Sequence, residues 1–145
     1  MFSKACEYGI KATLHIAEQA LNSNEKTGVK DISKHIDSPE AFTAKIMQIL
    51  SKNNIVKSVK GPSGGFYINK KDLEKIKLSA IVKAIDGDKI YVGCGLGLSQ
   101  CNEAKPCPVH DQFKVVRDEL AKMLTNTTLL ELATGLDFGL TFLKR

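Results

Sequence analysis

Hydrophobic side chains recur at helical spacing near the start of the chain. Tyr8, Ala12, Ile16 and Ala20 follow one another at intervals of four, which places them on one face of a helix predicted over residues 3–21. Polar residues follow this stretch and end the helix. One side of the helix is therefore expected to pack against a core.

Two shorter helices and a hairpin are predicted next. The second helix covers residues 29–36, and the third begins at Asp37-Ser38-Pro39-Glu40, where a capping residue precedes a proline at the first helical position, and ends near Lys52. Residues 55–60 and 66–68 then predict two strands, which a glycine-rich turn joins. Three helices followed by such a hairpin is the order of a winged helix-turn-helix.

The second half of the chain predicts a short helix over residues 78–86, an irregular stretch, a longer helix over 109–124 and a last short helix from Thr127. We therefore predict a mostly α-helical fold with a small β-hairpin wing and a long helix after the cysteines. The expected organisation is a DNA-binding winged helix-turn-helix domain (1–86), a cysteine-rich loop (87–107), and the long helix with a C-terminal helix (108–145), whose role in dimerisation is implied by the family resemblance described below.

Composition and charge narrow the class of protein. The 145 residues are 43% hydrophobic and 26% charged, which is typical of a globular protein, and the formal net charge is +5. No apolar run is long enough to cross a bilayer, and the N-terminus has no basic region followed by an apolar stretch. We therefore expect a cytoplasmic protein without a membrane partner.

Positive charge is concentrated in the middle of the chain. No acidic residue lies between Glu40 and Asp72, whereas six lysines do. They could form a solvated face, but next to a helix start and a diglycine turn they favour a duplex DNA partner. Arginine occurs only at positions 117 and 145, so bidentate arginine contacts to guanine are excluded from this segment. The predicted DNA-binding residues are Ser38, Ala41, Thr43, Ala44, Lys45, Lys57, Lys60, Ser63, Gly64 and Gly65.

A cysteine-rich loop suggests a metal centre. Cys94, Cys101 and Cys107 fall within fourteen residues, and His110 follows. Cysteine and histidine suit both iron–sulfur clusters and zinc, but the paired Cys-x₂-Cys spacing common in zinc sites is absent. From the spacing alone an iron–sulfur cluster, a zinc ion and free cysteines all remain open. Cys6 is interpreted as a small buried hydrophobic residue, and His15 and His35 as ordinary helix histidines.

Several segments resemble the IscR, NsrR and CymR family of bacterial regulators. The most specific is Gly61-Pro62-Ser63-Gly64-Gly65-Phe66 with a three-cysteine loop about thirty residues later; the others are 7–10, 49–56, 58–60 and 126–129. The resemblance implies a homodimer held by the long helix after the cysteines, with palindromic or nearly palindromic operators. It also favours an iron–sulfur cluster, with 2Fe–2S preferred and 4Fe–4S as the alternative.

The resemblance leaves two candidates for the fourth cluster ligand. His110 follows Cys107 by three residues, as in the IscR branch, which carries a 2Fe–2S cluster on three cysteines and a histidine. In the NsrR branch a residue at the position of Glu7 serves from the first helix of the partner subunit. We favour His110, because four ligands within one loop need no residue from a second subunit. If His110 is not a ligand, we expect it to be exposed to water at the start of the helix.

We therefore expect a homodimeric transcriptional regulator whose operator binding is controlled by the cluster through iron, redox or nitric oxide sensing. The alternative is a winged-helix regulator with structural zinc or no metal, controlled by a partner protein or a small ligand. An enzyme is not expected, because the sequence suggests no nucleophile–base pair with an acidic orienting group and no phosphate-binding loop before a helix.

Overall fold

The computed structural model describes residues 1–144 and confirms a mostly helical fold with a two-stranded antiparallel hairpin. Its elements are α1 (Lys4–Asn22), α2 (Val29–Ile36), α3 (Glu40–Lys52), β1 (Lys57–Val59), β2 (Gly65–Tyr67), the 3₁₀ turn η1 (Lys70–Asp72), α4 (Leu78–Asp86), α5 (Lys89–Val92), α6 (His110–Asn126) and α7 (Leu129–Asp137). Within these residues no helix is both long and apolar enough to span a membrane.

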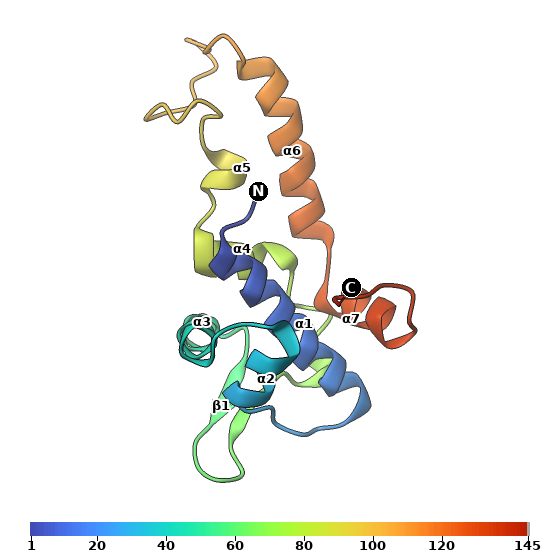
Figure 1. The fold of residues 1–145 in the computed structure, drawn as a ribbon. Coiled ribbons are helices and arrows are strands. Elements are labelled where there is room, and N and C mark those ends of the chain that lie inside the picture. Colours follow the sequence, from blue (N-terminus) through green and yellow to red (C-terminus); the bar gives the residue numbers. More distant parts are fainter. Residues whose placement is uncertain (145) are drawn as a thin grey trace.

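Helices α1 to α4, the hairpin and α7 pack together into one part of the molecule, here called the head, and α1 lies at its centre (Figure 1). It packs against α2, α3, α4 and α7. Its inner face is apolar, with Ile16 fully buried, and meets Ile32 of α2 and Ile46 of α3 in one core. This core also takes in Leu129 of α7, because α6 leads the chain back from the far end of the molecule to α1, where α7 packs. Burial of such side chains is the main driving force for these helices to form.

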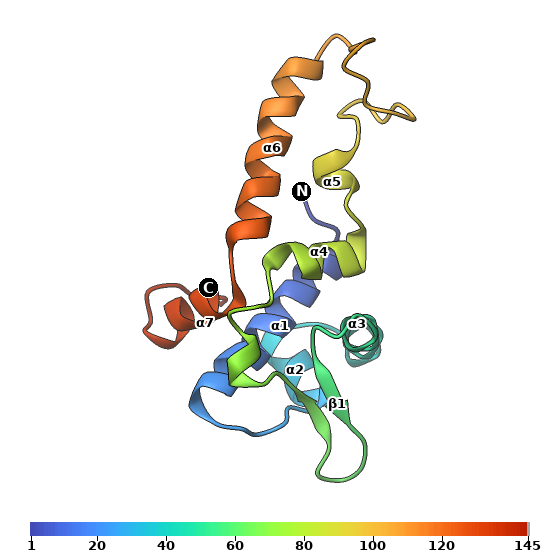
Figure 2. The ribbon, with the colours of Figure 1, turned by 180° about the vertical axis from the view of Figure 1, so that it is seen from behind.

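The hairpin is short and well anchored. Lys57, Ser58 and Val59 pair with Tyr67, Phe66 and Gly65. A further bridge joins Thr27, in the α1–α2 connection, to Phe66. The wing is therefore held to the helix-turn-helix by backbone hydrogen bonds, and its tip projects at the end of the molecule opposite the cysteine loop (Figures 1 and 2).

Helix α3 starts one residue later than predicted. Pro39 is the last residue before the helix rather than its first, and Asp37 adopts a left-handed conformation that ends α2. The Ser38 hydroxyl is not a cap: it is buried, and within the described chain it finds no hydrogen-bond partner. The cap position itself is taken by Pro39, which has no side-chain donor or acceptor.

Helix α6 and the residues before it form a projecting arm. α5, a single turn that the sequence did not predict, packs beside α6, and the loop that joins them runs to the far end of the arm (Figure 1). The buried Leu124 connects the base of α6 to Val82 of α4 and to Cys6 of α1. Cys6 is fully buried in this second cluster, as predicted.

Candidate nucleic-acid interface and metal centre

Helix α3 and the wing border a groove of about 820 Å³. Lys45 and Lys52 on α3 face Lys60 across it, and Phe66 contributes to the apolar floor. The Ser51 and Ser58 hydroxyls lie 3.4 Å apart and connect α3 to β1 at the edge of the groove. A helix and a hairpin that share one lysine-bearing surface can contact the phosphates of duplex DNA on both sides of a groove.

Most of the predicted DNA-binding residues lie on the outside of this region. Ala41 and Lys45 are exposed on α3, Ala44 and Ser38 are half-buried, and Lys60 and Ser63 are exposed on the wing; Gly64 and Gly65 form the half-buried end of the turn. In the turn, the Gly64 N–H donates to the Gly61 carbonyl at 2.9 Å. A β-carbon at Gly64 would lie 2.1 Å from the Val59 carbonyl oxygen, so glycine is required there.

The prediction for Thr43 is wrong. Its side chain is fully buried, and its hydroxyl donates to the Pro39 carbonyl at 3.0 Å. Thr43 lies three and four residues before Ile46 and Met47, which are buried, and so shares their inner face. Its side chain contributes to the packing of α3 and is not on the surface that DNA could reach.

Lys57 is exposed, but it lines a separate cavity with Asp72 and Lys75 rather than the groove. Adjacent strand residues point to opposite sides, so Lys57 faces away from its neighbour Ser58, which lines the groove. Any contact of Lys57 with DNA would come from outside the groove between α3 and the wing.

Two groove residues, Gln48 and Lys52, were missed by the sequence analysis. Both are exposed, and with Ala41 and Lys45 they form the outer face of α3. The helical period could have identified them, because positions 41, 45, 48 and 52 are spaced by three or four residues and so lie on one side of a helix. The Gln48 amide can donate and accept at once, as is needed to read adenine in the major groove.

The cysteine loop brings two of its predicted ligands into contact. The Cys101 Sγ atom lies 3.4 Å from Nδ1 of His110. His110 is 6% exposed, so the alternative of a water-facing residue is wrong. The three cysteines are half-buried free thiols, as expected of thiols available for a metal.

Arg117 of α6 joins this group and was not predicted. Its guanidinium donates to Cys101 Sγ at 3.0 Å and also to the Gly93 carbonyl. Backbone hydrogen bonds from Leu96 and Leu98 lower the pKa of the Cys94 thiol, and Cys107 and the positive charge of Arg117 lower it further. Cys94 is therefore shifted toward thiolate, the form that binds metal.

The four side chains are not arranged as a single-ion site. Among the described residues, one set of at least three His, Cys, Asp or Glu side chains has its ligand atoms within 4.8 Å of one another, and it consists of His15, Glu18 and His35. A tetrahedral zinc would draw thiolates to about 3.8 Å from one another. Glu7, the other candidate ligand, is on α1 and forms an ion pair with Lys4 at 3.2 Å.

Comparisons with known proteins identify the family of this chain. The sequence model of the Rrf2 family, described as an iron-dependent transcriptional regulator, matches residues 2–135. A protein of Aquifex aeolicus (strain VF5) assigned as an HTH-type transcriptional regulator is 32% identical over 134 residues, covering 91% of this chain and 90% of that protein. The regulator IscR of Serratia proteamaculans (strain 568) is 29% identical over 131 residues, which is 90% of this chain and 77% of IscR.

Two solved structures share the fold. CymR of B. subtilis, a global cysteine regulator, superposes with a TM-score of 0.75 at 21% identity, covering 92% of this chain and 96% of CymR. IscR of T. potens superposes with a TM-score of 0.71 at 18% identity, covering 98% of this chain and 92% of that protein. The sequence comparisons thus indicate a family of transcriptional regulators rather than enzymes. The structural comparisons also indicate the winged helix-turn-helix fold. The chain belongs to the Rrf2 family of winged helix-turn-helix, DNA-binding transcriptional regulators.

Proposed function

We propose that this chain is a homodimeric, cytoplasmic regulator whose operator binding is controlled by an iron–sulfur cluster on Cys94, Cys101, Cys107 and His110. The observation that carries the proposal is the contact between Cys101 and the buried His110 ring, with Arg117 on the same sulfur atom. It joins two of the four predicted ligands to a cation in the middle of α6.

The residues present fit such a group. Three thiols and an imidazole are donors that iron–sulfur clusters accept, and a ligand set wider than that of one ion suits a cluster of two irons. The positive charge of Arg117 would offset the negative charge that thiolates bring. When bound, the cluster would supply one-electron redox chemistry and sensitivity to oxidants or to iron supply.

His110 is the preferred fourth ligand. It is buried beside Cys101, whereas Glu7 is engaged by Lys4 on the surface of α1. A ligand from the same loop and helix also needs no second subunit for closure. The 2Fe–2S form is preferred over 4Fe–4S because the resemblance to the IscR branch implies it.

The DNA-binding surface is the groove between α3 and the wing. Lys45, Lys52 and Lys60 would neutralise phosphates, and Gln48 would reach base edges. If each subunit neutralises about three phosphates, the logarithm of the binding constant falls with the logarithm of salt concentration with a slope of roughly −5 for a dimer.

The partner of α6 is a second copy of this chain. Val116 and Met123, seven residues apart, lie on one side of α6 and are 62% and 46% exposed. Two such helices packed together would cover both faces and set two recognition helices about 34 Å apart, which calls for a palindromic or nearly palindromic operator. The loop lies between α5 and α6, so a cluster that orders it would alter how the arm is held against the head.

The decisive experiment is anaerobic purification followed by iron and sulfide analysis and a visible spectrum. We expect about two irons and two sulfides per chain, and charge-transfer bands that disappear in Cys101→Ser but remain in Cys6→Ala. Duplexes selected from a random library with the cluster-loaded protein then serve as probes. Their affinity should change at least fivefold on loss of the cluster, and should fall in Lys45→Ala but not in Lys122→Ala.

A second candidate is a regulator without a cluster, controlled by a partner protein or a small ligand, or one that holds structural zinc. The fold is shared with both CymR and IscR and is compatible with this candidate as well. Anaerobic protein that lacks iron, and whose DNA affinity is the same in Cys101→Ser, would favour this candidate and contradict cluster control.

A further inference from the structure

A second group of metal-ligating side chains lies in the head, away from the cysteine loop. His15 and Glu18 are three residues apart on α1 and share one face, and His35 comes from the last turn of α2. One ligand atom from each lies within 4.8 Å of the others. We propose that His15, Glu18 and His35 form a binding site for a divalent transition metal of the zinc class, independent of the cluster.

The burial of His15 supports the site. Its ring is 8% exposed, and its Nδ1 atom is buried without a hydrogen-bond partner among residues 1–144. A buried polar atom without a partner is rare in native proteins and calls for an explanation, for which an ion is one candidate. Two imidazoles and one carboxylate are the protein ligands of many zinc sites that keep a fourth position open.

The protonation of both imidazoles suits metal binding. Burial lowers the pKa of His15 to about 4, with the positive charges of His35 and Lys144 acting in the same direction and Asp31 opposing them. Burial and then Lys144 also lower the pKa of His35, while Glu18 raises it. Neutral imidazole is the form that ligates metal, so near neutral pH no proton has to be displaced from either ring.

The metal-free rings are stacked. The centroids of His15 and His35 are 3.7 Å apart, with 19° between the ring planes. The lone pair of an imidazole nitrogen lies in the plane of its ring, so an ion bound by two imidazoles must lie in both ring planes. The planes of two stacked rings are nearly parallel and do not meet at such a point. Binding at the usual distance of about 2.1 Å therefore requires one ring to rotate, and the half-buried His35 is the freer of the two.

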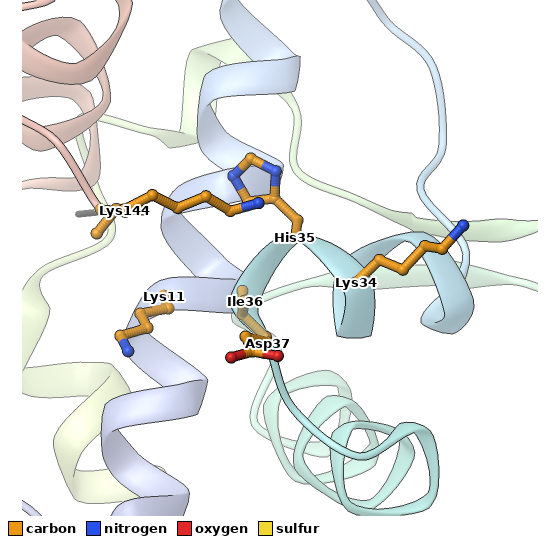
Figure 3. Close-up of a pocket in the computed structure, with 7 residues that line it drawn as sticks. Lys11, Lys34, His35, Ile36, Asp37 and Lys144 are labelled. Carbon is orange, nitrogen blue, oxygen red and sulfur yellow. The ribbon is translucent and has the colours of Figure 1, made fainter.

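The space for this rotation and for a fourth ligand is a cavity of about 420 Å³ beside His35. Figure 3 shows Lys144 extending toward the His35 ring, with Lys11 and Lys34 pointing away from it. Lys144 would have to withdraw when the ion enters, which it can do because it is exposed. The remaining lysines at the cavity favour an anion or a hydroxide as the fourth ligand.

Such an ion would tie α2, the first helix of the helix-turn-helix, to α1 at the centre of the core. Its effect is therefore expected on the stability of the head, which is measurable without DNA and without a cluster. Failure of cluster control would leave this inference standing, since the two sites share no residue.

The test uses the full chain with Cys94, Cys101 and Cys107 changed to serine, so that the loop cannot take up the ion. After EDTA treatment and dialysis, zinc chloride is titrated against a chromophoric chelator and Tm is recorded. We expect one zinc per chain with a Kd of 10 μM or below and a rise in Tm. His35→Ala and Glu18→Gln should weaken binding at least tenfold and abolish the rise, whereas Glu25→Gln on the neighbouring loop should change neither.

Cobalt chloride supplies a second readout, because a four-coordinate site gives intense visible d–d bands that a surface histidine does not. His35 and Glu18 are partly exposed, so both variants should fold, and their far-UV circular dichroism checks this. Zinc binding that is equal in His35→Ala, or no binding at 100 μM zinc, would overturn the proposal.

Discussion

Arg117 donates hydrogen bonds to Cys101 Sγ and to the Gly93 carbonyl, and so fastens α6 to two points of the cysteine loop. The two acceptors come eight residues apart and from opposite sides of Cys94. One guanidinium thus connects the arm helix to the loop and places a positive charge beside the thiols. The Nε atom of the same side chain is buried and, within the described residues, has no partner.

Arg117→Ala is expected to make the Cys94 thiol less acidic. The positive charge of Arg117 is one of the causes that lower the pKa of Cys94, so its removal raises that pKa and leaves less thiolate at neutral pH. Alkylation of Cys94 in metal-free protein, followed by mass spectrometry, should slow by roughly threefold or more. Lys122→Ala, which removes a positive charge elsewhere on α6, should leave the rate unchanged, and an unchanged rate in Arg117→Ala would contradict the prediction.

The DNA-binding half of the fold could be predicted because its signals are local. Helical period, a proline and a glycine-rich turn identify α3 and the wing. The error at Thr43 was one of helical phase, since the side chain follows the inward face that Ile46 and Met47 define. The single-turn helix α5 is too short for any periodicity to show.

In the candidate sites, too, residues that are close in sequence could be predicted, and residues that only the fold brings together could not. The three cysteines and His110 are close in sequence, so their grouping could be predicted. Arg117 reaches Cys101 only because the loop folds back along α6. His15 and His35 are twenty residues apart, and their contact depends on how α2 crosses α1. Tertiary packing decides such contacts, and the sequence pattern does not record it.

The wing turn should tolerate no side chain at Gly64. A β-carbon there would lie 2.1 Å from the Val59 carbonyl oxygen and 2.9 Å from that of Gly61, so Gly64→Ala must open the turn. We expect a loss of about 1–3 kcal/mol in the free energy of unfolding, measured with urea. Gly28→Ala is the matched control, because nothing lies within 4 Å of its β-carbon position and its φ is −76°. Equal losses in the two variants would show that the wing geometry is not the cause.

Val116→Glu should dissociate the proposed dimer. A charge in the centre of an apolar helix interface is buried without a partner and costs several kcal/mol per dimer, roughly. Light scattering after gel filtration should show the mass of a monomer, near 15.9 kDa. Thr125→Glu introduces the same group at an exposed position of similar size on another side of α6 and should stay dimeric. A Val116→Glu protein that remains dimeric would exclude this face as the interface.

The head should lose stability on mild acidification because of His15. Its pKa is about 4 in the folded protein, below the ordinary value of 6.5. Between these values the unfolded chain takes up a proton that the folded chain does not, so the free energy of unfolding falls as the pH falls from about 6.5 toward 4 and is unaffected by this group above that range. The slope is at most roughly 1.4 kcal/mol per pH unit for one histidine. His35 adds in the same direction, since its pKa is also lowered.

Urea unfolding at pH 7 and pH 5, with EDTA present to exclude metal, measures this effect. In His15→Gln the loss between the two pH values should shrink, because glutamine does not titrate and keeps a similar size. Acidic residues also contribute to the pH dependence of the wild type, so the comparison rests on the difference between the two proteins rather than on either curve. An identical loss in His15→Gln would mean that the imidazole is not held neutral by its burial, and would also remove one support for the zinc site.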